Sequence, residues 1–439
     1  MSQAGYLLSV PYGSGRQEAL LDPGRPVTVL AQRGHGGDAL RSGAGDNGEG
    51  APGELETILA ALAAPVGSPP LRELARGKRN VVVLTSDHTR PVPSSLTLPA
   101  MLAEIREGSP AAEITVLIGT GCHRGSTREE ITAKFGEGFA RRERILNHDP
   151  SDEEGLVSLG RLPSGGELRL SRLAASADLL AADGFIEPHQ FAGFSGGPKS
   201  VLPGVAAFRT VLASHNAEFT VHPKARPGSL DGNPFQRDML FAARKAGLAF
   251  ILNVTLDGAK RVSGAYAGDP ERAHRAGCAA VLDRCGVKAA PAPVVVTSNG
   301  GYPLDQNVYQ STKSIMQADL TCAEGGVIVA VNECRDGHGS LSFLDSFRNA
   351  SSLDALLAEI ESRGREDTVP DQWVIQLTAS ILRRRRVIMV TEAPRQAVED
   401  LGMTRADSLS AALGAAGEIL GDPLAPVTVL PDAVSVVIS

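Results

Sequence analysis

Runs of consecutive apolar residues alternate with segments of helical spacing along most of the chain. Residues 80–86 (N-V-V-V-L-T-S) are of the first kind, which is typical of a parallel strand covered on both faces. Pro99 opens a helical segment, at the position where a missing N–H costs least. The first half is predicted to contain strands at 80–86, 114–118 and 182–186 and helices at 54–63, 99–107 and 128–135. This order predicts an α/β domain with a mainly parallel sheet.

A second α/β domain is predicted from about Val294 onward. Asn299, Gly300 and Gly301 form a turn after its first strand, and the preceding residues 288–293 read as a linker. The predicted elements are strands at 294–297, 326–331 and 387–390 and a helix at 307–316. We therefore divide the chain into an N-terminal domain, 1–288, and a C-terminal domain, 289–422. The β-like residues 423–439 are expected to return to the first domain.

Length and composition agree with two or three domains. The chain has 439 residues, of which 42% are hydrophobic, enough for large cores. Residues 33–53 differ from the rest, being rich in Gly, Ala and Asp. We expect this stretch to be a mobile loop or a disordered insertion.

Charge and cysteine content exclude several classes of protein. With 43 basic and 50 acidic residues and few aromatics, the chain is a poor candidate for nucleic-acid binding, and its basic run at 383–386 reads as a helix end or surface. Its five cysteines are scattered and form no C-x-x-C pair, which argues against disulfides and a cysteine zinc site. The N-terminus does not resemble a signal peptide, and no apolar run approaches the roughly 20 residues of a membrane span. We expect a soluble, cytoplasmic protein without a membrane partner.

The richest chemistry lies in residues 187–204, E-P-H-Q-F-A-G-F-S-G-G-P-K-S-V-L-P-G, and in His215 downstream. His189 follows a strand, a glycine loop leads to Lys199, and a helix-like run reaches His215. Two imidazoles and an amine around a flexible loop can bind a metal, move protons and form a covalent bond to a cofactor.

Two plainer interpretations of this loop must be considered. A nucleotide-binding P-loop needs glycine before its lysine, but this chain has Pro198, which has no N–H to donate. A looser phosphate contact at the next helix N-terminus stays open. Taken alone, the loop also fits a glycine-rich turn with an exposed lysine, so the rest of the chain must decide.

Reactive side chains recur where predicted strands end, which is where open α/β sheets bind ligands. Each is ambiguous alone, but independent surface residues would not concentrate there. The sequence G-T-G-C-H-R-G at 119–125 lacks the spacing of a dinucleotide fingerprint. In the second domain, Gln310 and Lys313 are three residues apart and share a helix face. The strand-end candidates are Asp87, His88, Arg90, His123, Arg124 and His189, followed by Tyr309, Gln310 and Lys313.

The motifs together resemble the nickel-dependent lactate racemase family of nickel-pincer nucleotide 2-hydroxy acid racemases and epimerases. Five separated blocks and the lone Trp373 carry the resemblance, which covers most of the chain. The blocks are S-D-H-T-R-P-V-P (86–93), G-T-G-C-H-R (119–124), the segment 187–204, S-H-N-A (214–217) and Y-Q-S-T-K-S (309–314).

The resemblance implies an isomerase with two α/β domains and an active-site cleft between them. Its reaction is inversion of C2 of a lactate-like 2-hydroxy acid by hydride transfer to and from a nickel-pincer nucleotide. His123 and His189 would be the acid/base pair. The implied cofactor residues are Lys199 (thioamide attachment), His215 (nickel ligand), Asp87 and Trp373, and the implied substrate residues are Arg90, Tyr309, Gln310 and Lys313. Cofactor-biosynthesis proteins are the implied partners.

Two alternatives stay open at this point. A nicotinamide-dependent 2-hydroxy acid dehydrogenase would need a dinucleotide fingerprint, which the chain lacks. A non-catalytic metal- or nucleotide-binding protein would explain Lys199 and His215 but not the other histidines or the carboxylate clamp. The shared groups do not choose among lactate, larger, acidic or sugar-derived 2-hydroxy acids.

Overall fold

The computed structural model describes residues 6–32 and 53–439, which form two compact units. The central unit contains residues 53–283 and 364–368, and the terminal unit contains residues 6–32, 284–363 and 369–439. The expected mobile insertion, 33–53, lies outside the described residues except for Gly53.

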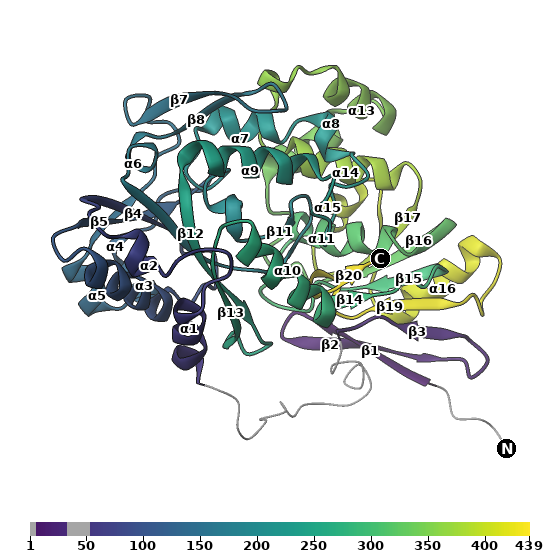
Figure 1. Cartoon of the computed structure of the whole chain (residues 1–439). Coiled ribbons are helices and arrows are strands. Elements are labelled where there is room, and N and C mark those ends of the chain that lie inside the picture. The colour runs from purple at the N-terminus through teal and green to yellow at the C-terminus, as the bar shows by residue number, and fades with distance from the viewer. Residues whose placement is uncertain (1–5, 33–52) are drawn as a thin grey trace. The chain divides into compact units, whose positions relative to one another are not determined.

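The central unit is built on a six-stranded sheet, in which only one edge strand is antiparallel (Figure 1). The strand pairs that join β12, β9, β4, β5 and β6 are all parallel. In spatial order the strands are β13 (Val262–Gly268), β12 (Leu248–Leu256), β9 (Leu179–Phe185), β4 (Asn80–Ser86), β5 (Glu113–Gly119) and β6 (Arg144–Asn147). The mainly parallel sheet expected from the apolar runs is confirmed.

Alternate side chains of β4 enter two different cores, because successive strand residues point to opposite faces. Val81 and Val83 pack in one core with α1 (Glu54–Ala63), α2 (Leu71–Leu74) and α3 (Ser94–Gly108). Val82 and Leu84 pack in the other with α9 (Pro234–Ala246). The sheet is therefore covered on both faces. The unit also contains α4 (Arg128–Phe135), α5 (Glu137–Arg142), α6 (Arg172–Ala175), α7 (Phe208–Ser214), α8 (Ala217–Thr220), α10 (Arg272–Cys285), and the strand pairs β7 (Leu156–Arg161) with β8 (Glu167–Ser171) and β10 (Pro188–His189) with β11 (Gly193–Phe194).

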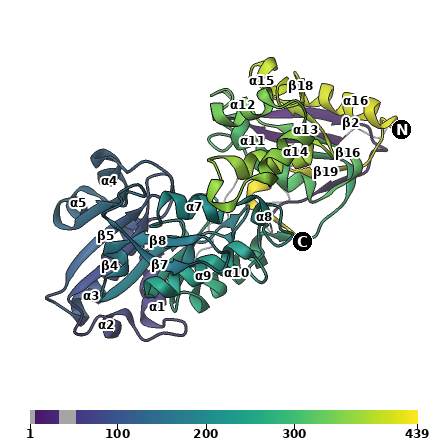
Figure 2. The ribbon, with the colours of Figure 1, turned by 90° about the horizontal axis from the view of Figure 1, so that it is seen from above.

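The terminal unit has a fully parallel six-stranded sheet (Figure 2). Its order is β18 (Thr404–Ala406), β17 (Arg386–Val390), β16 (Cys322–Val331), β15 (Ala292–Thr297), β19 (Val427–Leu430) and β3 (Val27–Val29). The hairpin of β1 (Tyr6–Tyr12) and β2 (Gly15–Leu21) shares a core with this sheet and α16 (Leu409–Leu420). The other elements are α11 (Val308–Asp319), α12 (Leu341–Asn349), α13 (Leu353–Ser362), α14 (Gln372–Leu382), α15 (Arg395–Glu399), β14 (Gly286–Val287) and β20 (Val437–Ile438).

The ends of the chain correct the expected domain division. The early strand β3 pairs with β19, so residues 6–32 belong with the terminal unit rather than with the first domain. Residues 423–439 lie in the terminal unit, where β19 pairs with β15 and β20 pairs with β14 at residues 286–287, near the end of the expected first domain. Pairing partners far along the chain leave no local signal, which is why sequence patterns missed them.

Helix α3 corrects a second expectation. It begins at Ser94, five residues before the predicted start, so Pro99 lies inside the helix. Its first turns are buried, and the hydroxyls of Ser94 and Thr97 donate to Asp183 Oδ2 at 2.9 and 2.7 Å. These tertiary bonds stabilise a helix start that the proline pattern alone disfavours.

The basic run follows α14, where Arg384 and Arg385 both pair with Asp319. It thus ends a helix and forms ion pairs within the unit. Across the described part of the chain, no helix combines the length and apolar character that crossing a membrane requires.

Candidate active site

The loops after β5 and β9 approach each other closely in the central unit. Gly121 N–H, in the loop that carries His123, donates to Gly204 O at 3.0 Å. A Cβ on Gly119 would lie 3.0 Å from the same carbonyl oxygen, so glycine there permits the approach. The backbone therefore brings the His123 loop beside the segment that carries Lys199.

Asp87 and His123 form a directly bonded pair. His123 Nδ1 lies 2.7 Å from Asp87 Oδ2, while the Thr89 amide donates to Oδ1 at 2.9 Å. Burial alone would raise the pKa of Asp87, but the bonds from His123 and Thr89 outweigh it and hold the pKa well below its usual range. An ionised carboxylate only accepts, so His123 Nδ1 must donate. Its Nε2 is then the basic nitrogen of the neutral ring.

Lys134 on α4 holds the loop between Asp87 and Arg90. Its Nζ donates to the backbone oxygens of both residues, each at 2.9 Å. Burial lowers the pKa of Lys134, and the nearby carboxyls of Asp183 and Asp87 act in the opposite direction. In the sequence Lys134 looks like an ordinary solvated helix lysine, so its contact with the loop was missed.

His88 and Arg124 turn toward Glu130 instead of joining this pair. Arg124 binds Glu130 through two nitrogens, at 2.8 and 2.6 Å. His88 Nδ1 lies 3.1 Å from Ser126 Oγ and 3.5 Å from Glu130 Oε2. These two strand-end candidates therefore serve the local structure around the start of α4.

His189 has a different attachment from His123. It sits on the short hairpin of β10 and β11, opposite Gly193. Its Nδ1 accepts the backbone N–H groups of Phe191 and Ala192, at 3.3 and 3.2 Å. In the neutral ring the proton must then reside on Nε2. His123 and His189 are thus held in opposite tautomers.

Two buried residues that the sequence did not single out support the glycine loop. Asn253 Oδ1 accepts the Gly197 N–H at 2.7 Å, and His274 Nε2 donates to Ser195 O at 2.8 Å. A Cβ on Gly196 would lie 2.6 Å from Asn253 Oδ1, and a Cβ on Gly197 would lie 2.5 Å from the His274 ring. Both glycines also have positive φ, 76° and 53°. The glycines are needed because the loop rests directly on these side chains.

Lys199 follows this loop on a single 3-10 turn, residues 197–200. Burial lowers the pKa of Lys199 to about 8, the charge of Arg90 adds to the effect, and Glu187 and Asp87 oppose it. A larger share of the amine is therefore neutral near pH 7 than for an exposed lysine. A neutral amine can act as a nucleophile toward an acyl or thioacyl group.

His215, at the end of α7, is buried and hydrogen-bonded through one ring nitrogen. Its Nδ1 donates to Val211 O at 2.8 Å, which makes Nε2 the nitrogen that carries the ring's lone pair. Burial lowers the pKa of His215 to about 4, with the charge of Lys199 adding to this and the Val211 bond opposing it. The ring is therefore neutral at pH 7, the state that binds metals.

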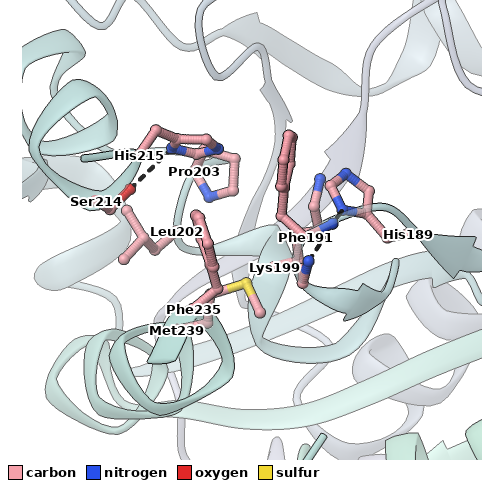
Figure 3. Close-up of a pocket in the computed structure, with 10 residues that line it drawn as sticks. His189, Phe191, Lys199, Leu202, Pro203, Ser214, His215, Phe235 and Met239 are labelled. Atoms are coloured by element: carbon pink, nitrogen blue, oxygen red, sulfur yellow. Dashed lines mark hydrogen bonds between the residues drawn. The ribbon is translucent and has the colours of Figure 1, made fainter. Parts of the chain in front are cut away.

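One pocket collects three of the predicted residues. His189, Lys199 and His215 line it together with aromatic and aliphatic side chains (Figure 3). The Phe191 ring lies between the two histidines, with its centroid 6.2 Å from that of His189 and 6.4 Å from that of His215. Phe235 stacks on Phe191 at 5.8 Å. The pocket thus sets an amine and two imidazoles in largely apolar surroundings.

The remaining predicted residues lie in the terminal unit. Tyr309, Gln310 and Lys313 are on α11, with Lys313 exposed and Gln310 half-buried. Trp373 is the second residue of α14, which packs against α11. The shared helix face of Gln310 and Lys313 follows from their spacing, as predicted.

Comparison with known proteins identifies the family of this chain. The family models described as lactate racemase N-terminal domain and lactate racemase C-terminal domain match residues 42–228 and 287–438. The chain belongs to the lactate racemase family. It is 48% identical to the lactate racemase of Thermoanaerobacterium thermosaccharolyticum over 386 residues, covering 88% of this chain and 90% of the relative. The lactate racemase of Lactiplantibacillus plantarum is 44% identical over the same length, covering 88% and 91%.

Solved structures agree with the family assignment. The lactate racemase apoprotein of T. thermosaccharolyticum superposes with a TM-score of 0.91 at 43% identity, covering 99% of this chain and all of that one. A Thermotoga maritima protein has a TM-score of 0.57 at 20% identity over 77% of this chain and 91% of its own, which indicates a shared fold only. The predicted family, the two-domain α/β class and the isomerase class are confirmed.

Proposed function

We propose that this protein racemises lactate or a closely related 2-hydroxy acid, using a nickel-pincer nucleotide attached to Lys199. The observation that carries the proposal is the pocket in which Lys199, His189 and His215 meet, with both Lys199 and His215 shifted toward their neutral forms. Lactate is the substrate named for both curated relatives.

The donor set of this pocket fits the cofactor. An amine with a pKa of about 8 can be acylated to a thioamide, and a neutral imidazole with a committed Nδ1 offers one nitrogen to nickel. When bound, the nickel-pincer nucleotide supplies a reversible hydride acceptor. Lys199 would hold it covalently and His215 would be its protein nickel ligand.

The protein's own part in the reaction is proton transfer and orientation. His123 Nε2 would take the hydroxyl proton of one enantiomer, and the ionised Asp87 would stabilise the imidazolium that forms. His189 would be the acid/base group for the hydroxyl of the other enantiomer; its neutral ring donates a hydrogen bond from Nε2, so taking a proton there would first require the ring proton to move to Nδ1. Two such groups are needed because the two enantiomers place the hydroxyl differently.

Substrate binding is assigned to charged and polar side chains. Arg90 would hold the carboxylate with its planar guanidinium, the geometry that suits carboxylate recognition. Its loop is kept in place by Lys134. In the terminal unit, Lys313, Gln310 and Tyr309 remain proposed substrate contacts, and Trp373 a proposed cofactor contact.

The test is to produce the protein together with the cofactor-biosynthesis proteins and to measure intact mass, nickel content and lactate racemisation by chiral chromatography. Wild type should carry an adduct and nickel, and Lys199→Ala should lose both with all activity. Exposed Lys224→Ala is the matched control and should behave as wild type. An adduct retained in Lys199→Ala, or turnover that consumes a nicotinamide, would reject the proposal. A panel of enantiopure 2-hydroxy acids then sets the substrate range.

A further inference from the structure

Asn253 is a polar residue in the middle of the buried strand β12. Its neighbours Leu252 and Val254 pack in the apolar core on one face of the sheet, so the Asn253 side chain lies on the opposite face. Only 1% of Asn253 is exposed. Burying an amide costs free energy unless it is hydrogen-bonded, so the partner of Asn253 indicates what the residue does.

That partner is the peptide group that joins Gly196 and Gly197. The N–H of this peptide donates to Asn253 Oδ1 at 2.7 Å, and its C=O accepts the Lys199 N–H at 3.2 Å. Hydrogen bonds on the two sides of one peptide group polarise each other, which strengthens both. A single peptide group therefore connects Asn253 to the backbone of the lysine.

The turn that carries Lys199 needs this bond because its own N-cap residue cannot cap it. The first N–H groups of a helical turn lack partners within the turn, and an N-cap side chain usually supplies the acceptor. Here the N-cap residue is Gly196, which has no side chain. Asn253 supplies the acceptor instead, from a strand 56 residues further along the chain.

The same peptide lies between two glycines, so its plane can rotate unless something fixes it. Gly196 and Gly197 have positive φ values, which glycine adopts readily. Because neither residue carries a Cβ, exchanging the sides of the N–H and the C=O meets little steric resistance. Such a flip would break the bonds to both Asn253 and Lys199.

The neighbouring strand leaves room for the Asn253 amide. Gly184 on β9 is directly opposite Asn253, and a Cβ on Gly184 would lie 3.0 Å from Asn253 Nδ2. A Cβ on Gly196 would collide with Oδ1 of the same side chain. Glycines on both the strand and the loop thus allow the amide to reach the peptide that it binds.

We propose that Asn253 is a positioning residue that locks the Gly196–Gly197 peptide in one orientation and thereby keeps Lys199 in the pocket with His189 and His215. The inference rests on the proposed function, in which Lys199 is the point of cofactor attachment. All of these residues belong to the central unit.

The main test is Asn253→Leu, which keeps a branched side chain of similar size but removes the acceptor. Leaving the Gly197 N–H buried and unpaired should disfavour the present orientation about 5- to 150-fold. In the apoprotein, hydrogen exchange of peptides that span residues 193–202, measured by mass spectrometry, should become at least about fivefold faster. A crystal structure of the variant should show the peptide reoriented and Lys199 displaced from the pocket.

Cofactor attachment provides the second measurement. The protein is produced together with the cofactor-biosynthesis proteins, and intact mass gives the fraction of folded protein that carries the adduct after a fixed, short time. This fraction should fall at least about fivefold in Asn253→Leu, because the amine no longer lies where the cofactor binds. Asn253→Ala removes the acceptor without filling the space and should behave in the same way.

Two further variants separate positioning from general damage. Asn253→Asp keeps an oxygen in the place of Oδ1 and should stay within about twofold of wild type in both measurements. Thr255→Val is the matched control, because Thr255 is buried two residues along the same strand, on the same face, and its hydroxyl is bonded to Ser263. This control should match wild type.

Unchanged hydrogen exchange in Asn253→Leu, or faster exchange with an unchanged adduct fraction, would show that the inference is wrong. An equal loss in Thr255→Val, or no recovery in Asn253→Asp, would also overturn it. If wild type itself gains no adduct, the proposed function is rejected. The exchange rates and crystal structures of the apoproteins would then still decide whether Asn253 fixes the position of Lys199.

Discussion

Two groups of loops in the central unit differ in whether their buried ionisable side chains keep their charge. In the first group, which holds Asp87, Arg90 and His123, the carboxyl of Asp87 keeps its charge. In the second, the glycine loop with Lys199 and the neighbouring His215, burial shifts an amine and an imidazole toward their neutral forms. His274 beneath the loop is shifted in the same direction.

The difference teaches that burial alone does not decide which groups stay ionised, because strong hydrogen-bond partners can reverse its effect. Burial is the largest single influence on the pKa of Asp87 as well, yet donors from His123 and Thr89 reverse its effect. For Lys199 and His215, burial prevails over the opposing contacts. One unit thereby provides a charged carboxylate that orients an imidazole, a neutral imidazole, and an amine with a larger neutral share than an exposed lysine has.

Among variants that keep Lys199, the largest effect should come from removing the charge of Asp87 in the first group. In Asp87→Asn the amide can present a donor to His123 Nδ1, so the ring loses the tautomer with a basic Nε2. We expect racemisation to fall by about 10²- to 10⁴-fold, the usual range for general acid–base catalysis. Chiral chromatography on enzyme matched for nickel content measures it. Thr89→Val removes the hydroxyl but keeps the backbone N–H that donates to Asp87, so this variant should lose far less activity. An equal loss of activity in both variants would contradict the role assigned to the charge of Asp87.

Lys134→Met tests whether the loop of the first group needs the hydrogen bonds that the Lys134 amine donates to Asp87 O and Arg90 O. Two carbonyl oxygens would lose a charged donor, so the free energy of unfolding should fall by about 2 to 3 kcal/mol. The KM should rise as well, because the Arg90 loop loosens. Urea unfolding and steady-state kinetics measure the two effects. Lys134→Arg, which can donate to both carbonyls, should recover much of the loss; unchanged stability in Lys134→Met would contradict the role assigned to the contact.

His274→Gln should produce a smaller, pH-dependent effect in the second group. Burial lowers the pKa of His274 to about 4 in the folded protein, against about 6.5 unfolded. Between these values the unfolded chain binds more protons, so stability falls as pH falls. Wild type should lose about 2 kcal/mol more than the variant between pH 7 and pH 4.5.

Urea unfolding over this pH range measures the difference, and the contribution of His215 cancels because both proteins retain it. The glutamine side chain of the variant keeps an N–H for Ser195 O, so the two proteins should be most alike in stability near pH 7 and diverge in acid, where wild type becomes the less stable. Parallel stability curves would show that His274 is not held neutral.

The structure also shows why some elements were predictable and others were not. The strand at residues 80–86 and the helices at 54–63 and 128–135 have their predicted ends, because apolar runs and helix caps are local signals. The early start of α3 depends on Asp183, which lies far along the chain. Local patterns cannot report a bond of that kind.

The same division applies to the candidate site. Strand ends and glycine spacing were enough to select Asp87, His123, His189 and Lys199 as candidates. The residues that support them, including Lys134, Asn253 and His274, occupy ordinary-looking positions in helices and strands. Their importance comes from contacts across more than 40 residues of sequence, such as His274 with Ser195.

By itself, then, the sequence determined the α/β class, the family and the candidates for the reactive side chains, because these follow from residue types at short spacings. Only the tertiary structure decided their states: which nitrogen of each histidine carries the proton, which groups are ionised, and where both chain ends pair. Such states depend on burial and on hydrogen-bond partners, and folding brings these together from distant parts of the chain.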